Sequence, residues 1–231
     1  MAPDGRTPLR SRARAEASSW GAVAYAQAVS RLWTLLLLLA LVASVVGTAS
    51  SSGQPSAGAS ATCGVERWAV KTLSDARAGE VNFTPKTTTV GALRSKTAPA
   101  IGFSTPRLDG VETTTYRVRA KLIEYALEDD HDIHLVISSP TSTAKTMIVE
   151  FPDPTCPGAR TSPKKTAMAH TRAALIAACG SPTTSFHNLH GSATITGVGF
   201  FDVKHGQSGV APNAIELHPV LGFTNASCSR P

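Results

Sequence analysis

Apolar and polar residues alternate along several short segments in the second half of the chain. In TYRVRAKLIEYALE, residues 115–128, apolar residues alternate with three cations over the first half of the segment. A period of two is typical of a strand with one buried face. The runs IHLVIS and KTMIVEF are joined by a turn rich in Ser, Thr and Pro. Residues 133–151 are therefore predicted to form a β-hairpin.

A helical pattern is found only between residues 164 and 178, in KKTAMAHTRAALIAA. Good helix formers fill this segment, and Gly180 follows it as a stop signal. Residues 68–73, WAVKTL, are predicted to be a first short strand, and residues 74–109 to be irregular or to form short hairpins. The pattern predicts a mainly β fold with one inserted helix.

The stretch 191–223 concentrates polar and titratable side chains between two apolar runs. It is predicted to begin as a strand, to pass through a loop rich in Gly and Pro, and to return as a second strand. The loop carries Asp202, His205, Gln207 and Asn213, and the second strand carries Glu216 and His218. We expect function to be located in this stretch.

The N-terminal 49 residues have a different character. Residues 1–31 show no pattern that would bury a face, whereas residues 32–49 form an apolar run with Arg31 before it and small residues at its end. This arrangement predicts a signal peptide, with a single uncleaved membrane helix as the alternative. Residues 50–62 are predicted to be a flexible tether, and residues 63–228 a single β-rich domain. The protein is thus expected to be secreted, or anchored in the cell membrane with this domain outside.

Four cysteines follow the export signal, at positions 63, 156, 179 and 228. An even number in an exported chain favours disulfides over a zinc site, and no close CxxC pair is present. Three pairings are possible. The favoured one joins Cys63 to Cys228, at the two ends of the domain, and Cys156 to Cys179, which flank the predicted helix.

The net charge of the chain does not indicate a particular class of binding partner. The formal net charge is +6, but residues 1–49 hold five arginines and only two acidic residues, so 17 basic and 14 acidic residues remain beyond them. That surplus is too small to indicate nucleic-acid binding. The chain has no GxSxG motif and no phosphate-binding loop, which disfavours a serine-triad hydrolase and a P-loop enzyme.

Acidic and imidazole side chains occur together at three places. Asp132 and His134, and likewise Glu216 and His218, are two residues apart, so each pair shares one face of a strand. Asp202 and His205 lie in the loop between. These six residues are candidate ligands of a divalent metal ion, which is the one cofactor the sequence suggests. The list of metal candidates is Asp132, His134, Asp202, His205, Glu216 and His218.

A structural role is the alternative for the same residues. A loop that leaves one strand and enters another has many backbone groups to satisfy. Gln207 and Asn213 suit that task, or could bind a ligand together with Arg119 on the strand at 115–128.

The span 116–223 resembles a small OB-like β-barrel. Its segments EDDHDIHLVIS, IVEFPDPTC and GVGFFDVKHGQSGVAPNAIELHPV are similar to a group of uncharacterised exported bacterial proteins. The hairpin 130–153 also resembles the core of staphylococcal-nuclease-like domains. That resemblance implies that Asp132 and Glu150 are metal ligands and that Asp153 is a general base.

Two functions are therefore expected to compete. The first is a non-enzymatic extracellular binding or structural module that presents the polar loop 202–218 to an unknown partner. The alternative is a divalent-metal-dependent phosphodiesterase of the nuclease type, and only this alternative involves nucleic acid. Contact with a membrane is expected only through residues 32–49, if they are not cleaved.

Overall fold

The computed structural model describes residues 63–231 of the chain. The predictions of a signal peptide or anchor in residues 1–49 and of a tether in residues 50–62 lie outside the described residues. Within residues 63–231, no helix combines the length and the apolar character that a membrane crossing requires.

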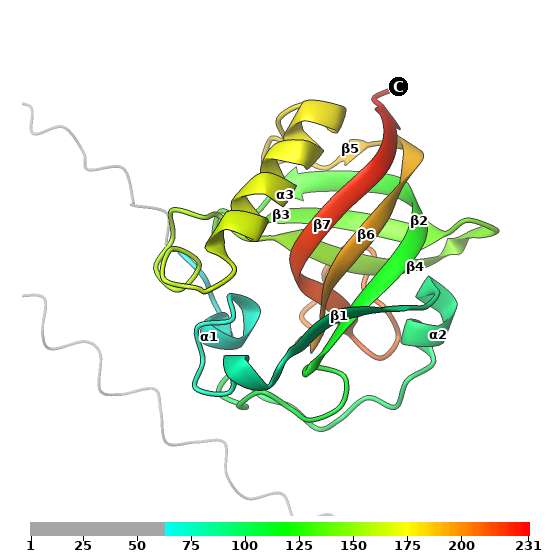
Figure 1. The fold of residues 1–231 in the computed structure, drawn as a ribbon. Coiled ribbons are helices and arrows are strands. Elements are labelled where there is room, and N and C mark those ends of the chain that lie inside the picture. Colours follow the sequence, from blue (N-terminus) through cyan, green and yellow to red (C-terminus); the bar gives the residue numbers. More distant parts are fainter. Residues whose placement is uncertain (1–62) are drawn as a thin grey trace, which may run out of the picture. The chain divides into compact units, whose positions relative to one another are not determined.

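Seven strands form one sheet, which confirms the mainly β prediction (Figure 1). The hydrogen-bonded order is β1-β2-β3-β4-β7-β6, with β5 beside β2, and β6 also pairs with β2. The pairing therefore runs in a closed circuit through five strands. The pairs β1–β2 and β4–β7 are parallel, and the others are antiparallel. The strands are β1 (Asn82–Thr87), β2 (Thr114–Leu127), β3 (Ile133–Ser139), β4 (Ser142–Phe151), β5 (His187–Asn188), β6 (His190–Phe201) and β7 (Ile215–Ser229).

The predicted hairpin is present as β3 and β4, and His134 lies directly opposite Glu150 in its register. Its apolar side chains point into the main hydrophobic core, as their alternation indicated. The polar side chains of the same strands consequently lie on the opposite face of the sheet. The core residues contributed by the hairpin are Ile133, Leu135, Ile137, Met147, Val149 and Phe151.

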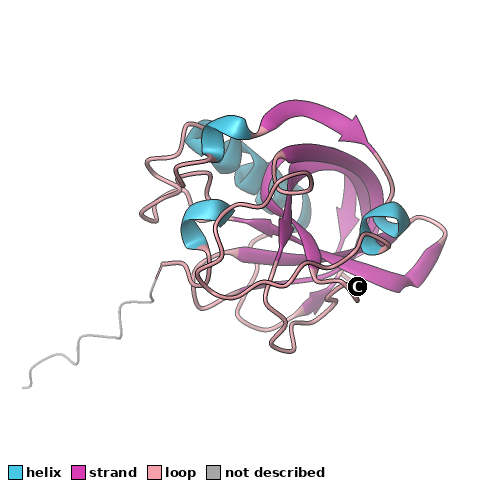
Figure 2. Cartoon of the chain, turned by 90° about the horizontal axis from the view of Figure 1, so that it is seen from below, coloured by secondary structure: helices cyan, strands magenta, loops and turns pink. Residues whose placement is uncertain are grey.

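Helix α3 (Lys165–Cys179) confirms the one predicted helix and packs mainly against β7. Its buried side chains are spaced three or four residues apart, which is the spacing of one helical face. Figure 2 shows the helices at the periphery of the strands. The buried residues of α3 are Met168, Thr171, Leu175 and Cys179.

The first predicted strand is wrong. Residues 68–73 contain helix α1 (Trp68–Lys71), which is followed by Thr72, whose hydroxyl donates to the carbonyl of Trp68 at 2.8 Å. A short apolar run fits a helix and a strand equally well, so periodicity could not separate them. The side chain of Arg67, directly before α1, is buried in contacts with residues distant in the sequence, which a local pattern does not encode.

The region predicted to be irregular or to form hairpins holds three short elements and no hairpin: η1 (Ala78–Glu80), β1, and α2 (Val90–Arg94). A buried ion pair joins the residues that flank this region. Arg67 donates two hydrogen bonds to the carboxylate of Glu112, at 2.7 and 2.6 Å, and a third to the carbonyl of Phe201. Both charged side chains are fully buried, so removing either partner would leave an unpaired charge in the interior.

All four cysteines are in disulfides, but the favoured pairing is wrong. Cys63 is bonded to Cys156, and Cys179 to Cys228. The end of α3 lies beside the last strand, so Cys179 meets Cys228, and β7 continues to Ser229. Two disulfides indicate an oxidising, extracellular environment.

Candidate metal-binding pocket

The polar faces of β3, β4 and β7 come together outside the hydrophobic core. Asp132 immediately precedes β3, and His134 and Glu150 face each other across the hairpin. The parallel pairing of β4 with β7 sets Ile148 opposite Glu216, which brings Glu216 and His218 next to Glu150. The structure therefore unites residues of β3, β4 and β7 with Asp132 just before β3, and these residues are up to 86 positions apart, from Asp132 to His218.

The imidazole of His218 lies between two carboxylates. Its Nδ1 atom is 2.8 Å from Oε2 of Glu150, and its Nε2 atom is 3.2 Å from Oδ2 of Asp132. Neither contact has the alignment of a hydrogen bond, and all four of these atoms are without a hydrogen-bond partner in the described part of the chain. Asp132 and His218 are completely buried. Three ligand atoms, one each from Asp132, Glu150 and His218, lie within 4.8 Å of one another.

His134 occupies a similar position on the other side of Glu150. Its Nδ1 atom is 2.7 Å from Oε1 of Glu128 and 3.5 Å from Oε1 of Glu150. Its Nε2 atom donates to the backbone carbonyl of Ser208 at 3.0 Å, since a carbonyl oxygen only accepts. The ring of Phe186 packs edge-on against this imidazole, with 5.3 Å between the ring centroids.

Buried oxygens without partners are concentrated in this cluster. Buried polar atoms are normally hydrogen-bonded, and each exception costs about 1–3 kcal/mol. Here several carboxylate oxygens, on β4 and β7 and directly beside β3 and β6, are both buried and unpartnered within residues 63–231. They are Oδ2 of Asp132, Oε2 of Glu150, Oδ1 of Asp202, and Oε1 and Oε2 of Glu216.

The charges of the cluster perturb one another strongly. Burial alone would lower the pKa of His218, but the carboxylates of Glu150 and Asp132 outweigh burial and raise this pKa to about 10. In the same way Glu128 and Glu150 raise the pKa of His134 to about 10. Burial, together with the charges of Glu150 and Asp202, raises the pKa of Glu216 well above its usual range. Without a metal ion, these three side chains therefore keep their protons to a higher pH than usual, because positive charge is favoured among the neighbouring carboxylates.

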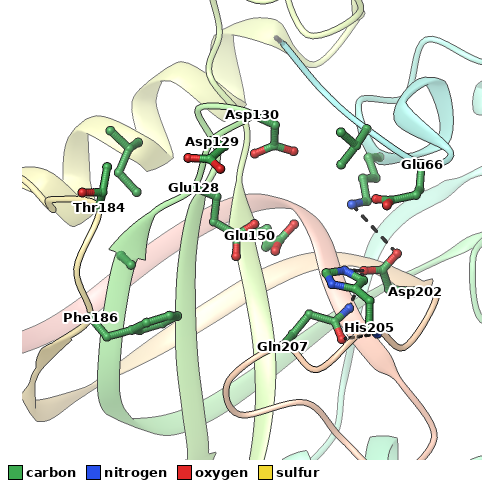
Figure 3. Close-up of a pocket in the computed structure, with 14 residues that line it drawn as sticks. Glu66, Glu128, Asp129, Asp130, Glu150, Thr184, Phe186, Asp202, His205 and Gln207 are labelled. Carbon is green, nitrogen blue, oxygen red and sulfur yellow. Dashed lines mark hydrogen bonds and ion pairs between the residues drawn. The ribbon is translucent and has the colours of Figure 1, made fainter. Parts of the chain in front are cut away.

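A cavity of about 370 Å³ opens above these residues. In Figure 3, Glu128 and Glu150 point to the middle of the pocket, between Phe186 on one side and Asp202 on the other. The walls contain six carboxylates, whereas Lys71 and His205 are the basic residues among them. The acidic residues of the lining are Glu66, Glu128, Asp129, Asp130, Glu150 and Asp202.

The loop after β6 covers one side of the pocket. Asp202 accepts a hydrogen bond from Nε2 of Gln207 at 3.0 Å, and its other oxygen lies 3.9 Å from Nζ of Lys71 (Figure 3). His205 is largely exposed, with its Nε2 atom 4.0 Å from Asp202. Lys71 is almost completely buried, and its ammonium lies 5.7 Å from the ring centre of Phe200.

The metal candidates predicted from the sequence do not form a single group. Asp132 and His218 meet at Glu150, His134 meets Glu150 from the other side, and Glu216 lies next to this group on β7. Asp202 and His205 line the opposite wall of the pocket, where Lys71 and Gln207 both contact Asp202. Glu150 is the residue shared by the two groups of carboxylates and imidazole, one with Asp132 and His218 and the other with Glu128 and His134.

Three other predicted site residues lie outside the pocket lining. The Asp153 carboxylate accepts hydrogen bonds from the backbone and hydroxyl of Thr155, so it caps a turn. Arg119 lies on the exposed face of β2, where it donates to Asn225 and Ser192. Asn213 donates to the carbonyls of Leu93 and Lys96 at the end of α2. The structural role considered from the sequence fits Asn213.

Three important residues were missed from the sequence. Glu128 belongs to the acidic run EDDHD, so its proximity to His134 could have been considered once the hairpin was predicted. Lys71 gave no signal, because it lies on a segment predicted as a strand and reaches the pocket only through the tertiary fold. The aromatic wall at Phe186 was likewise invisible to pattern analysis.

Comparison with protein-family models finds no match, and neither curated proteins nor solved structures show a significant similarity to this chain. The site must therefore be interpreted from its own chemistry. Imidazole nitrogens combined with carboxylate oxygens are the donor set of Mn²⁺, Fe²⁺ and Zn²⁺, whereas Ca²⁺ and Mg²⁺ prefer oxygen alone. The residues at Asp132, Glu150 and His218 fit such an ion in type, number and proximity.

Proposed function

We propose that this protein is an exported binding module that holds a divalent metal ion at Asp132, Glu150 and His218, beneath an acidic pocket. The observation that carries the proposal is the meeting of unpartnered, buried ligand atoms from β4, β7 and the residue just before β3. An ion bound through one ring nitrogen of His218 would neutralise the adjacent carboxylates and give the ligand atoms that it binds a partner. Mn²⁺, Fe²⁺ and Zn²⁺ are the ions that the donor set favours.

The strand connections support an OB-like barrel as the framework of this module. The five strands β2, β3, β4, β6 and β7 pair in a closed circuit, and α3 is inserted between β4 and β6. OB-folds bind their ligands on the face of their second and third strands and with the loops after their first and fourth strands. In this chain those parts are the polar face of β3 and β4, the loop 128–132 and the loop 202–214. These segments supply much of the pocket wall.

A non-enzymatic module accounts for the burial better than a hydrolase does. Asp132, His134, Glu216 and His218 converge as an active site would require, but all four are buried. The members of the cluster that line the pocket are Glu150 and Glu128. Six carboxylates around this opening also disfavour an anionic polymer such as nucleic acid.

A metal-dependent phosphodiesterase is the second candidate. One observation favours it: the hairpin that resembles staphylococcal-nuclease-like domains indeed places Asp132 and Glu150 close to a common partner, His218. An assay with a labelled single-stranded oligonucleotide and Mn²⁺ addresses this candidate. Cleavage that disappears in Asp132→Asn would establish it, and intact oligonucleotide would leave the binding module.

Metal analysis tests the main proposal. The purified protein is treated with EDTA, dialysed, and then titrated with Mn²⁺ or Zn²⁺ while metal content and the melting temperature are measured. An ion present at one hundred times its Kd stabilises the fold by about 2.7 kcal/mol. That stabilisation corresponds to roughly 5–10 °C for a domain of this size.

The matched variants are His218→Asn and His190→Asn. His218 lies at the centre of the site, whereas His190 is exposed at the start of β6. We expect His218→Asn to lose the metal-induced stabilisation and His190→Asn to keep it. Equal metal-induced shifts in both variants, or no bound metal in the wild type, would refute the proposal.

A further inference from the structure

Glu128, His134 and Glu150 form a second group of potential metal ligands beside the first. One ligand atom from each of them lies within 4.8 Å of the other two. The composition repeats that of the first group, with one imidazole and two carboxylates, and Glu150 is common to both. Glu150 and Glu128 both line the pocket, so an ion from solvent has a path to this second group.

The hydrogen bonds of His134 give independent support for a ligand at its Nδ1 atom. The Nε2–H group is committed to the carbonyl of Ser208. Metal-binding histidines characteristically donate their other ring N–H to a carbonyl or carboxylate in this way, which fixes the orientation of the ring. Nδ1 of His134 therefore faces the carboxylates of Glu128 and Glu150, at 2.7 and 3.5 Å. All three groups are acceptors, so a proton or a metal ion must lie between them.

The two oxygens of Glu150 are directed to different imidazoles. Oε1 is the atom nearest to His134, and Oε2 is the atom nearest to His218. The carboxylate is almost completely buried, and Oε2 has no hydrogen-bond partner in the described residues. A carboxylate with one oxygen in each of two ligand groups has the arrangement of a bridging ligand.

We propose that the pocket holds two divalent metal ions bridged by the carboxylate of Glu150. The first is the ion of the proposed function, at Asp132 and His218, and the second is bound by Glu128 and His134. This inference rests on the proposed function because the bridge requires the first ion. Paired metal sites of this kind usually hold their ions about 3.5–4 Å apart.

The number of bound ions tests the proposal on the purified full chain. Metal-free protein is titrated with Mn²⁺ in a calorimeter, bound manganese is counted after gel filtration, and electron paramagnetic resonance at low temperature detects magnetic coupling between neighbouring ions. The variants are Glu128→Gln, which removes a ligand of the second ion only, and Asp129→Asn. Asp129 is an exposed carboxylate in the same pocket wall, so Asp129→Asn is the matched control.

We expect two ions and a coupled spectrum in the wild type and in Asp129→Asn, and one ion with an uncoupled spectrum in Glu128→Gln. One ion in the wild type, unchanged in Glu128→Gln, would overturn the second ion and leave the proposed function intact. Two ions in Glu128→Gln would also overturn it, because the second ion would then lie elsewhere. No bound ion in the wild type would refute the proposed function together with this inference.

Discussion

Replacing Glu216 by glutamine should stabilise the metal-free protein. Glu216 is buried to 1% exposure, and neither of its carboxylate oxygens has a hydrogen-bond partner in residues 63–231. Burial and the neighbouring charges of Glu150 and Asp202 raise its pKa well above the usual range. The folded protein therefore keeps a proton on Glu216 at pH values where the unfolded chain has lost it. Glutamine has the shape of the protonated side chain and needs no proton.

The size of the stabilisation in Glu216→Gln and the direction of its pH dependence follow from proton linkage. An unfolded glutamate has a pKa of about 4.3, and each pH unit above that value costs about 1.4 kcal/mol to keep the proton. Wild-type stability should thus decline as pH rises from about 4.3 toward the raised folded pKa. The advantage of Glu216→Gln should grow with pH across this window, with a limiting slope of about 1.4 kcal/mol per pH unit for one proton. Each kcal/mol corresponds to roughly 2–4 °C in melting temperature.

Thermal unfolding in EDTA between pH 4 and pH 6 measures this difference. Asp129→Asn is the control, because it removes an exposed carboxylate near the same pocket. A raised Glu216 pKa would be ruled out if Glu216→Gln were no more stable than the wild type at pH 6, or if its advantage did not grow with pH. Either result would mean that Glu216 is charged and well solvated or paired in the folded protein.

Three further variants test the framework around the site. Arg67→Met leaves its buried carboxylate partner unpaired, so urea unfolding should show a loss of about 3–5 kcal/mol. The double substitution of Cys179 and Cys228 by serine opens a loop of 49 residues, and denaturation should show a loss of up to about 4 kcal/mol. In Gly191→Ala the new β-carbon would lie 1.9 Å from a backbone oxygen of β7, so the melting temperature should fall by many degrees; an unchanged value would show that β6 and β7 do not pair as described.

The local part of the site could be predicted from the sequence. A spacing of two residues in a strand places Asp132 and His134 on one face, and the hairpin then makes Glu150 their neighbour. These relations depend only on strand periodicity and on one short turn. The structure confirms both the hairpin and the outward face.

The remaining part depends on contacts that periodicity does not encode. His218 reaches Glu150 because β7 pairs in parallel with β4, a long-range arrangement that no local pattern specifies. Lys71 enters the pocket from helix α1, a segment that the sequence pattern predicted to be a strand. The pairing of Cys179 with Cys228 likewise depends on where α3 ends against β7, and spacing along the chain favoured another partner for each.

Anomalous X-ray diffraction from crystals soaked in Mn²⁺ or Zn²⁺ locates a bound ion itself. We expect an anomalous peak about 2.0–2.3 Å from atoms of Asp132, Glu150 and His218. A peak that is confined to surface carboxylates, or the absence of any peak while His218 still lies between the two carboxylates, would contradict the proposed metal site.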